Sequence, residues 1–449
     1  MSVYKLEKPD ISEHGLTIED YANHEYYLTL SELAIKANQP KYLYWDKIKF
    51  FNYPEGIEPL KFWGFLKGFR NLPFTTKRSL LRNEDGEFFH WNMLEHYHYK
   101  CDEFERALAG GMSPASQFDE YKSRIIKTKW LMEESITSAQ LEGAHTTLDA
   151  AKKILRENRK PKNNSERMIV NNYKTMLALE QDFKDVNLDR TALFQLHEML
   201  VRDTDIKKDA IGRFRNDSEN IMIFDDNDGT IYHIPPKEAF MLEEVDRLLA
   251  YANDEITDDG YIRPVIKAII LHFWMGYLHP FVDGNGRLAR ALFHWYLLKH
   301  GYWAITVLPI SVMIRKSSKQ YGMAYVYSEQ DDNDLTYFID YNIRKMYEAK
   351  KSLDEYIEKQ KIMEDRISTT VGSQSEFNER QTQLVIHLFK NPGSFTTIKT
   401  HSTIYKVSRV TARKDLELLS AAGYLHSKKV GREVRYFPTD KLKQLRVPQ

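Results

Sequence analysis

One short stretch of this sequence holds most of the residue types that could do chemistry. His-Pro-Phe-Val-Asp-Gly-Asn-Gly-Arg-Leu-Ala-Arg, at positions 279–290, brings together a histidine, a carboxylate, two glycines and two arginines. Pro280 disfavours helical geometry in the residue before it, so the preceding helix is expected to end near Leu278. The next helix is expected to begin near Gly286 or Arg287. The stretch is therefore predicted to be a loop that leads into a helix N-terminus.

Such a loop is suited to binding an anion. A helix N-terminus presents unpaired backbone N–H groups and the positive end of the helix dipole, and glycines allow a close approach to phosphate. Arg287 and Arg290 are spaced to share one helix face, where guanidinium groups can bind phosphate oxygens. Asp283 would repel a phosphate unless a divalent cation lay between them, and His279 is a candidate general base. Each residue alone has a structural explanation, but together they favour a Mg-nucleotide site.

The same twelve residues resemble the Fic family motif His-Pro-Phe-x-Asp/Glu-Gly-Asn-Gly-Arg-x-x-Arg at every specified position. The resemblance covers about residues 113–360. It implies a protein adenylyltransferase, which moves AMP from ATP to a Ser, Thr or Tyr hydroxyl of a target protein or of itself. It assigns His279 as the base and Asp283 as the ligand of Mg²⁺ (or Mn²⁺). The predicted ATP contacts are Gly284, Asn285 and Gly286 as anion hole, Arg287 on the phosphates and Arg290 on the γ-phosphate.

Other chemistry remains open within the family. The related Doc toxins carry lysine at the second glycine and transfer phosphate, so Gly286 favours AMP transfer here. Some members transfer uridylyl or phosphocholine groups, and others remove AMP from targets. The motif does not separate these reactions.

A second short stretch resembles the family's inhibitory motif. Ser-Ala-Gln-Leu-Glu-Gly at 138–143 places Ser138 and Glu142 four residues apart on a predicted helix. In the family this glutamate pairs with the second motif arginine, here Arg290, and blocks productive placement of the γ-phosphate. The alternative is a solvated glutamate near a helix end that Gly143 terminates. The resemblance predicts an enzyme held inactive by Glu142.

Between these two stretches lies a predicted β-hairpin, about residues 220–233, which corresponds to the family's flap. An extended segment of a target could add to its edge as a strand, through main-chain hydrogen bonds that tolerate many sequences. An ordinary surface hairpin is the alternative. The residues predicted to dock a target are Ile221, Met222, Ile223, Ile231 and Tyr232.

The tail from Val371 to Gln449 is basic, with fourteen Lys and Arg against six Asp and Glu. Its predicted order of three helices and a hairpin is that of a winged helix-turn-helix, with Ser408 as the cap of the third helix. Such a domain binds DNA, forms dimers or docks proteins, which leaves open a DNA-binding regulator with a secondary Fic core. The candidate DNA contacts are Arg409, Thr411, Arg413, Lys414 and Arg432, with Lys428, Lys429 and Arg435 on the wing.

The elements that position these sites are expected to be mostly α-helical. We expect an N-terminal accessory region (1–112), a Fic-type helical core with a hairpin flap (113–365), a linker (366–379) and the winged helix (380–449). Of the 449 residues, 64 are Lys or Arg and 64 are Asp or Glu, so the chain as a whole is not a basic nucleic-acid binder. A single cysteine, Cys101, suits a reducing cytoplasm, and no membrane partner is expected. The sequence leaves a homodimer open.

Overall fold

The structure is a computed structural model. It describes all residues except 1, 13–15, 18–19, 21, 74, 109–119, 225–227, 259, 372–376, 391–392, 432 and 444–449. The chain is mostly helical, as predicted, with small antiparallel sheets. It divides into two compact units, each built from three chain segments. The first contains Met1–Glu105, Lys174–Tyr302 and Met313–Tyr347, and the second contains Arg106–Tyr173, Trp303–Val312 and Glu348–Gln449.

The first unit contains the 279–290 loop. Its elements are α2 (His24–Asn38), α3 (Trp45–Ile48), α4 (Pro59–Arg70), β1 (Thr76–Arg82), β2 (Phe88–Asn92), α9 (Arg190–Val201), β3 (Ile223–Phe224), β4 (Ile231–His233), α10 (Glu238–Ala252), α11 (Pro264–Leu278), α12 (Asn285–Lys299) and α14 (Ser318–Gln330). Short helical turns are η2 (Leu179–Phe183), η3 (Lys208–Ala210) and η4 (Asp217–Glu219). Four helices continue across a boundary between the units: α5 (Glu95–Leu108), α8 (Asn164–Ala178), α13 (Ile310–Arg315) and α15 (Thr336–Val371).

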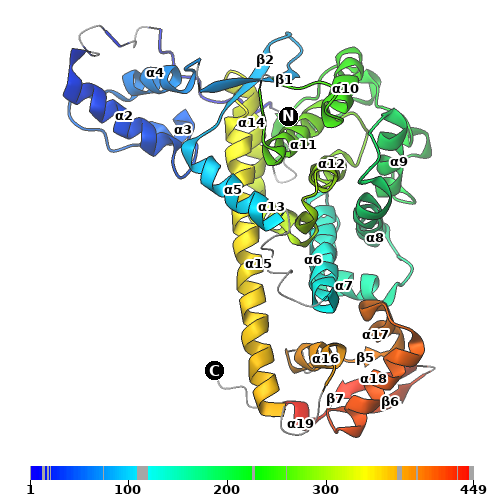
Figure 1. Ribbon diagram of the computed structural model, residues 1–449. Helices are drawn as coiled ribbons and strands as arrows, with labels where there is room; N and C mark the ends of the chain where they lie inside the picture. Colours follow the sequence, from blue (N-terminus) through cyan, green and yellow to red (C-terminus); the bar gives the residue numbers. More distant parts are fainter. Residues whose placement is uncertain are drawn as a thin grey trace. The chain divides into compact units, whose positions relative to one another are not determined.

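Helices α11 and α12 form the centre of the first unit and lie side by side (Figure 1). Pro264 occupies the first turn of α11, where its missing N–H leaves no helical hydrogen bond unmade. Nearly every side chain of α11 is buried, including Lys267 and His272. A helix that is apolar on all sides is buried within a protein core. The loop therefore joins two helices whose positions are fixed by packing within the core.

The N-terminal residues, whose arrangement the sequence did not reveal, pack around their own aromatic core. We call this the N-terminal cluster: Leu6 and other buried residues of the first 66 positions, mostly from α2, α3 and α4, with Val326 and Tyr337 from later in the chain. Arg70 is buried at its centre and donates to Asn38 Oδ1 at 2.9 Å and Leu43 O at 2.9 Å. Its guanidinium lies 3.7 Å from the Tyr42 ring centroid, a cation–π contact. The region is therefore a packed layer of the first unit.

The second unit contains the predicted inhibitory helix. Its elements are α6 (Glu120–Leu141), α7 (Leu148–Glu157), η5 (Trp303–Val307), α16 (Glu379–Lys390), β5 (Thr396–Thr397), α17 (Ile398–Tyr405), α18 (Arg409–Ala421), β6 (Leu425–Val430), β7 (Glu433–Pro438) and α19 (Asp440–Lys443). Apolar side chains of α6, α7 and α8 form one core cluster. The buried Glu134 carboxylate on α6 accepts from the N–H and hydroxyl of Ser311, at 2.8 and 2.5 Å. These hydrogen bonds tie the middle of α6 to the start of α13.

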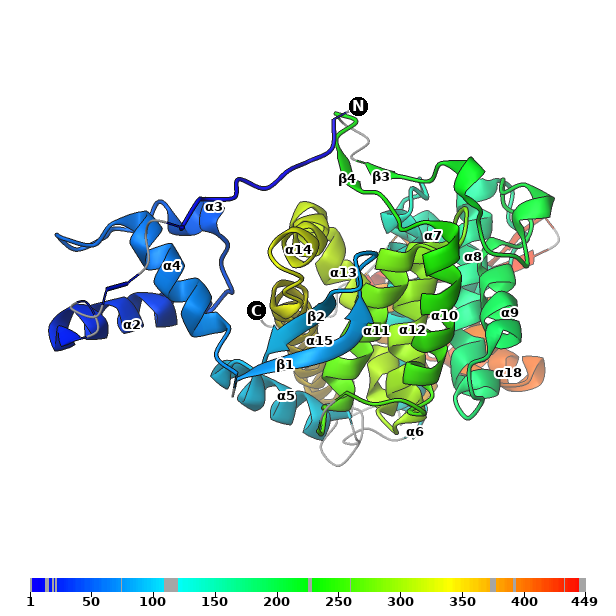
Figure 2. The same ribbon diagram turned by 90° about the horizontal axis from the view of Figure 1, so that it is seen from above.

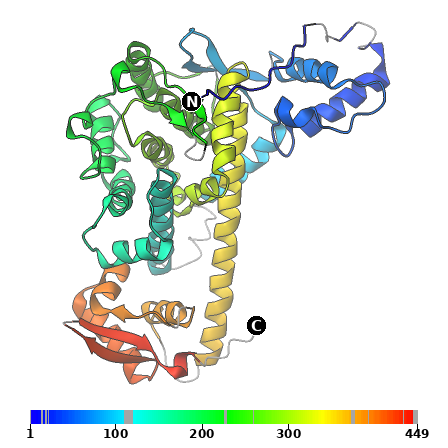
Figure 3. The same ribbon diagram turned by 180° about the vertical axis from the view of Figure 1, so that it is seen from behind.

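At the C-terminal end of this unit, α16 is followed by β5, then by α17 and α18, and then by β6 and β7 (Figure 3). The three strands form an antiparallel sheet of order β5-β7-β6. Ser408 caps α18 as predicted, since its hydroxyl accepts from Thr411 N–H at 3.1 Å. The stretch expected to be a linker is helical up to Val371. Helix α17 contacts both α6 and α7, and buried Tyr405 lies beside Arg156 of α7. The C-terminal helices thus share a packing surface with the helices that carry the predicted inhibitory motif.

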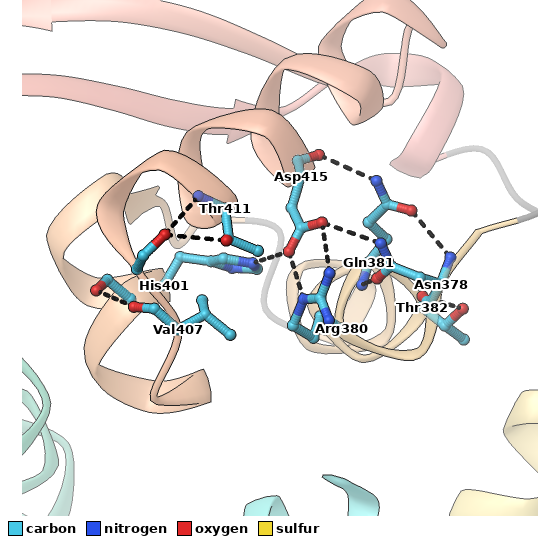
Figure 4. A network of polar contacts seen from close by, with 10 residues as sticks. Asn378, Arg380, Gln381, Thr382, His401, Val407, Thr411 and Asp415 are labelled. Carbon is cyan, nitrogen blue, oxygen red and sulfur yellow. Dashed lines mark hydrogen bonds and ion pairs between the residues drawn. The ribbon is translucent and has the colours of Figure 1, made fainter.

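An ion-pair network around the buried Asp415 carboxylate connects these C-terminal elements (Figure 4). The Asp415 carboxylate accepts from Arg380 Nε at 2.6 Å, from Asn378 Nδ2 at 2.9 Å and from His401 Nε2 at 3.2 Å. Burial raises the pKa of Asp415, but these hydrogen bonds outweigh it and lower the pKa overall. Burial also lowers the pKa of His401. One carboxylate therefore joins α16, α17 and α18.

Among the described residues, none of the helices is long and apolar enough to cross a membrane. Helix α11, which is strongly apolar, is a buried core helix.

Candidate active site

His279 terminates α11 and lies at the entrance of the loop. It adopts the left-handed conformation, with φ 45°, immediately after Leu278, where the helix was predicted to end. Its Nδ1 lies 3.3 Å from Gly276 O. A carbonyl can only accept, so Nδ1 carries the proton and the lone pair of Nε2 is left to take one. Desolvation, and then the nearby His233, lower the pKa of His279 to about 3, so the imidazole is neutral at neutral pH. A neutral ring is the form that a general base requires.

Arg215 holds the loop entrance through the backbone. Its Nε donates to His279 O at 2.8 Å, and its Nη2 donates to Pro236 O at 2.5 Å and Leu278 O at 3.3 Å. Its own N–H donates to Pro280 O at 2.8 Å. The side chain is 4% exposed, so these hydrogen bonds are shielded from water. Arg215 thereby ties the start of the loop to the chain that follows the flap.

His233, at the end of β4, also fixes this region. Its Nε2 donates to Tyr277 O at 2.8 Å and its Nδ1 donates to the Glu329 carboxylate at 2.7 Å. With both nitrogens donating, the ring is an imidazolium. Burial lowers the pKa of His233, but Glu329 outweighs this and raises it overall. The resulting positive charge helps to keep His279 neutral.

The middle of the loop is fixed by the buried amide of Asn285. Its Oδ1 accepts from Phe281 N–H at 2.9 Å and its Nδ2 donates to Phe281 O at 2.7 Å. Helix α12 begins at Asn285, one residue earlier than expected, because Gly284 takes φ 89° and acts as the N-cap. The first helical hydrogen bond runs from Leu288 N to Gly284 O. The N–H groups of residues 285–287 therefore lie at the helix N-terminus, the part of a helix that attracts anions.

The two arginines of the loop have different surroundings. Arg287 is 0% exposed and donates to Asp283 Oδ2 at 3.0 Å and to Leu200 O at 2.9 Å. Its Nε is buried and has no hydrogen-bond partner among the described residues. Arg290, 4% exposed, lies close enough to His272 to lower that ring's pKa, after desolvation, to about 3. In this structure Arg287 orients the Asp283 carboxylate, while its phosphate role stays a prediction.

His197 of α9 is a further positioning residue that the sequence did not indicate. Its ring stacks on Phe281 with centroids 3.8 Å apart and an interplanar angle of 11°. Its Nε2 donates to Asp283 O at 2.9 Å. Desolvation lowers its pKa to about 4, so it stays neutral beside Arg287. No sequence motif marks His197, because its partners Phe281 and Asp283 lie far along the chain and reach it only after folding.

The loop lies within a region that matches a known protein family. Residues 187–297 match the Fic/DOC family model. The chain carries a Fic domain. Proteins named protein adenylyltransferase Fic from Drosophila sechellia and Drosophila melanogaster are 28% identical over 152 residues. That match covers 34% of this chain and 28% of theirs, so it spans less than a third of the length of these relatives.

Two solved structures of low sequence identity are also similar to this chain. A Fic family protein from Desulfovibrio desulfuricans G20 is 18% identical, with a TM-score of 0.49 over 78% of this chain and 97% of that one. Fic-1 from C. elegans is 18% identical, with a TM-score of 0.41 over 59% of this chain and 71% of that one.

Within the Fic domain, Asp283 is the residue that would hold a divalent cation. Its side chain is 47% exposed, with one oxygen 2.6 Å from Gly284 N and the other bonded to Arg287. The described residues contain no group of three or more His, Cys, Asp or Glu side chains that could hold a metal alone. One carboxylate that shares the ion with phosphate oxygens is the usual arrangement for Mg²⁺, so the residues fit a metal that arrives with a nucleotide.

The two residues of the predicted inhibitory motif lie at the end of α6 in the second unit. Ser138 is buried at 3% exposure. Glu142 is half-buried and follows the last helical residue, Leu141, in a turn where its N–H donates to Ala139 O at 3.1 Å. Gly143 ends this turn with φ 86°. Their inhibitory role stays a prediction.

The hairpin that corresponds to the flap is present but shorter than expected. β3 pairs with β4 in antiparallel register, Ile223 opposite His233 and Phe224 opposite Ile231, with an irregularity between them. Ile223 lies in β3, while Ile221 and Met222 precede it; Ile231 and Tyr232 lie in β4. The tip, 225–227, lies outside the described residues.

The candidate DNA contacts of the tail differ in exposure. Arg409, Arg413 and Lys414 are exposed on α18, and Lys428 and Lys429 are exposed on β6. The Thr411 hydroxyl lies 3.0 Å from Ser408 Oγ and belongs to the helix cap. Arg435 pairs with Glu433 at 3.3 Å. Arg432 lies outside the described residues.

Proposed function

We propose that this chain is a protein adenylyltransferase, which transfers AMP from ATP to a Ser, Thr or Tyr hydroxyl of a target protein or of itself. The observation that carries the proposal is the complete 279–290 motif, with a neutral His279 at one end and a helix N-terminus at the other. The match to the Fic/DOC family and the similarity to named adenylyltransferases support a transferase.

The proposed reaction uses each end of the loop. His279 Nε2 accepts the proton of the target hydroxyl, and that oxygen attacks the α-phosphorus of ATP. The bond from the α-phosphorus to the bridging oxygen breaks, and pyrophosphate leaves. The backbone N–H groups of residues 285–287 bind phosphate oxygens, and Arg290 holds the γ-phosphate. Mg²⁺ held by Asp283, when bound, neutralises phosphate charge.

The test of this proposal is His279→Ala. With ATP labelled on the α-phosphate, we expect the variant to lose label transfer to protein by roughly 10²–10⁴-fold, the usual loss for a general base. ATP affinity, measured by calorimetry, should stay close to that of the parent chain because other residues contact the phosphates. His98→Ala, an exposed histidine on α5, is the matched control. Near-parental labelling by His279→Ala would exclude the assigned role.

We further propose that Glu142 inhibits the enzyme by pairing with Arg290. Glu142→Gly should then free Arg290 for the γ-phosphate and raise automodification about tenfold or more, equivalent to ~1.4 kcal/mol per tenfold. Arg290→Ala in the same chain should cancel the gain. If the gain survives the loss of Arg290, the glutamate acts by another route, and if there is no gain, it is an ordinary helix end.

Target recognition is proposed to use the flap, with an extended target segment pairing with one of its strands and presenting a hydroxyl to His279.

A second candidate function, DNA binding by a winged helix in the tail, is favoured by a specific observation. The guanidinium and ammonium groups of Arg409, Arg413 and Lys414 are exposed, and no carboxylate among the described residues lies within ion-pairing distance of them. Exposed cations on the third helix of such a domain are suited to phosphate contacts.

A further inference from the structure

The first residues of the chain form an isolated β-bridge to the two-stranded flap. Residues 2–6, here called the N-terminal strap, run alongside β4 (Figure 2). The Ile231 N–H donates to Ser2 O at 3.0 Å, and the Tyr4 N–H donates to Ile231 O at 2.8 Å. Val3 and Ile231 thus form a parallel bridge. Both main-chain groups of Ile231 are used by the strap, so this edge of β4 is already paired.

The strap is anchored on its other side by the end of α14. Gln330 Nε2 donates to Tyr4 O at 2.9 Å, and Gln330 Oε1 accepts from Leu6 N–H at 2.9 Å. The amide of Gln330 therefore bonds the strap as a neighbouring strand would. The preceding residue, Glu329, binds His233 of β4. Two consecutive residues of α14 thus hold the strap and the flap in fixed relation.

Side-chain burial adds to this anchoring. Leu6 is 8% exposed and belongs to the N-terminal cluster. The Tyr4 ring packs against the same cluster and lies 5.6 Å from the Tyr232 ring. Displacing the strap would break four hydrogen bonds and expose these apolar groups to water. A target strand cannot take the β4 edge without that loss.

The opposite edge of the flap has different surroundings. Met222 and Phe224 on the β3 side are 40% and 47% exposed, and they alternate with the half-buried Ile221 and Ile223. Alternating exposure of apolar side chains along a strand edge suits pairing with an extended peptide that carries apolar side chains at every second position.

We propose that the strap is a fixed third strand of the flap, and that an extended segment of the target protein pairs with the β3 edge. The inference rests on the proposed function, since it concerns how a target reaches His279. Two isolated strands of this length are marginally stable, so the strap also stabilises the flap, while His233 is held separately by Glu329 and by Tyr277 O. The N-terminal residues then belong to the target-docking apparatus.

The first test uses Tyr4→Pro, which removes the N–H that binds Ile231, with Tyr4→Ala as the control that loses the ring and keeps the N–H. The substrate is dephosphorylated β-casein, an extended protein rich in hydroxyls. We expect Tyr4→Pro to reduce kcat/KM for AMP transfer to casein at least tenfold, mainly through KM. AMP transfer to water should stay within twofold of the parent chain. The kcat/KM for casein should fall less in Tyr4→Ala than in Tyr4→Pro.

Two other results would overturn the proposal. Faster labelling of casein by Tyr4→Pro would mean that the strap competes with targets for the β4 edge, and unchanged labelling would mean that the strap has no part in docking. A different result would contradict the proposed function itself. In that case, neither the parent chain nor the Glu142→Gly variant would transfer AMP to casein or to water.

A second test needs no catalysis. The photo-crosslinking residue p-benzoylphenylalanine replaces Met222 in one variant and Val3, which is 42% exposed on the strap, in another. On irradiation with casein and without ATP, we expect adducts from position 222 and few from position 3. Adducts mainly from position 3, or from neither position, would refute the assignment of the β3 edge.

Discussion

Gly284→Ala tests whether the backbone of the loop, and not only its side chains, is required for activity. Gly284 has φ 89°, in the left-handed region that side chains with a Cβ disfavour. A Cβ built there would lie 3.0 Å from Val201 Cγ1 and 3.5 Å from His197 Cδ2. Both neighbours are buried, so the loop would have to move by a few tenths of an ångström. Since Gly284 is the N-cap of α12, that movement would shift the anion-binding N–H groups.

Gly301→Ala is the matched control. Gly301 has φ 81°, but nothing lies within 4 Å of a Cβ built on it. The backbone strain of each substitution is on the order of 1–2 kcal/mol, and crowding at Gly284 adds roughly 1–3 kcal/mol. We therefore expect both variants to lose stability in urea unfolding, with Gly284→Ala losing more.

Activity should separate the two variants more clearly than stability. Loss of one well-placed oxyanion donor costs roughly 10²–10³-fold in rate. We expect Gly284→Ala to lose AMP transfer to that extent at 25 °C, where it is still folded, while Gly301→Ala keeps near-parental activity. If Gly284→Ala transfers AMP within threefold of Gly301→Ala, the position of the α12 N-terminus does not limit the reaction and the reasoning is wrong.

The remaining predictions concern the C-terminal elements. Asp415→Asn should lower the unfolding free energy by roughly 1.5–3 kcal/mol, because the buried side chain loses its charge-assisted hydrogen bonds, including the one to the partly exposed Arg380. Thermal circular dichroism tests this, and no measurable loss would contradict it. The folded state depresses the pKa of both Asp415 and His401, so the unfolded chain binds more protons in acid. Stability should be full above about pH 6.5 and fall below it, and melting curves that do not change between pH 7.5 and 4.5 would refute this. If the tail binds duplex DNA, affinity should fall steeply with salt, and Arg413→Ala should reduce the slope of log K against log salt by about 1, while Lys36→Ala leaves it unchanged.

The sequence predicted which loop residues could do chemistry, but it did not predict which distant residues hold the loop in position. Pro280 and the glycines set local geometry within a few residues, so the end of α11 and the loop-to-helix arrangement could be read from neighbouring positions. His197, Arg215, His233 and Glu329 reach the loop from distant parts of the chain. Their contacts depend on tertiary packing, for which a single sequence offers no periodic signal.

The N-terminal region illustrates a different limit. Its helices are short, and its core is completed by Val326 and Tyr337 from far along the chain. The aromatic residues that form this core therefore have no regular spacing in sequence. For the same reason the pairing of the strap with β4 was not foreseen, because a three-residue contact between the first residues and Ile231 leaves no pattern.

The position of the strap also bears on how the protein is prepared for study. Residue 2 pairs with β4, so any polypeptide fused ahead of it emerges beside the flap. An affinity tag at that end would extend directly from the strap, whose pairing with β4 we expect target docking to require. Material that carries such a tag would underestimate activity toward proteins while hydrolysing ATP normally. A cleavable tag, or one placed after Gln449, avoids confusing a purification artefact with the inhibition that we propose for Glu142.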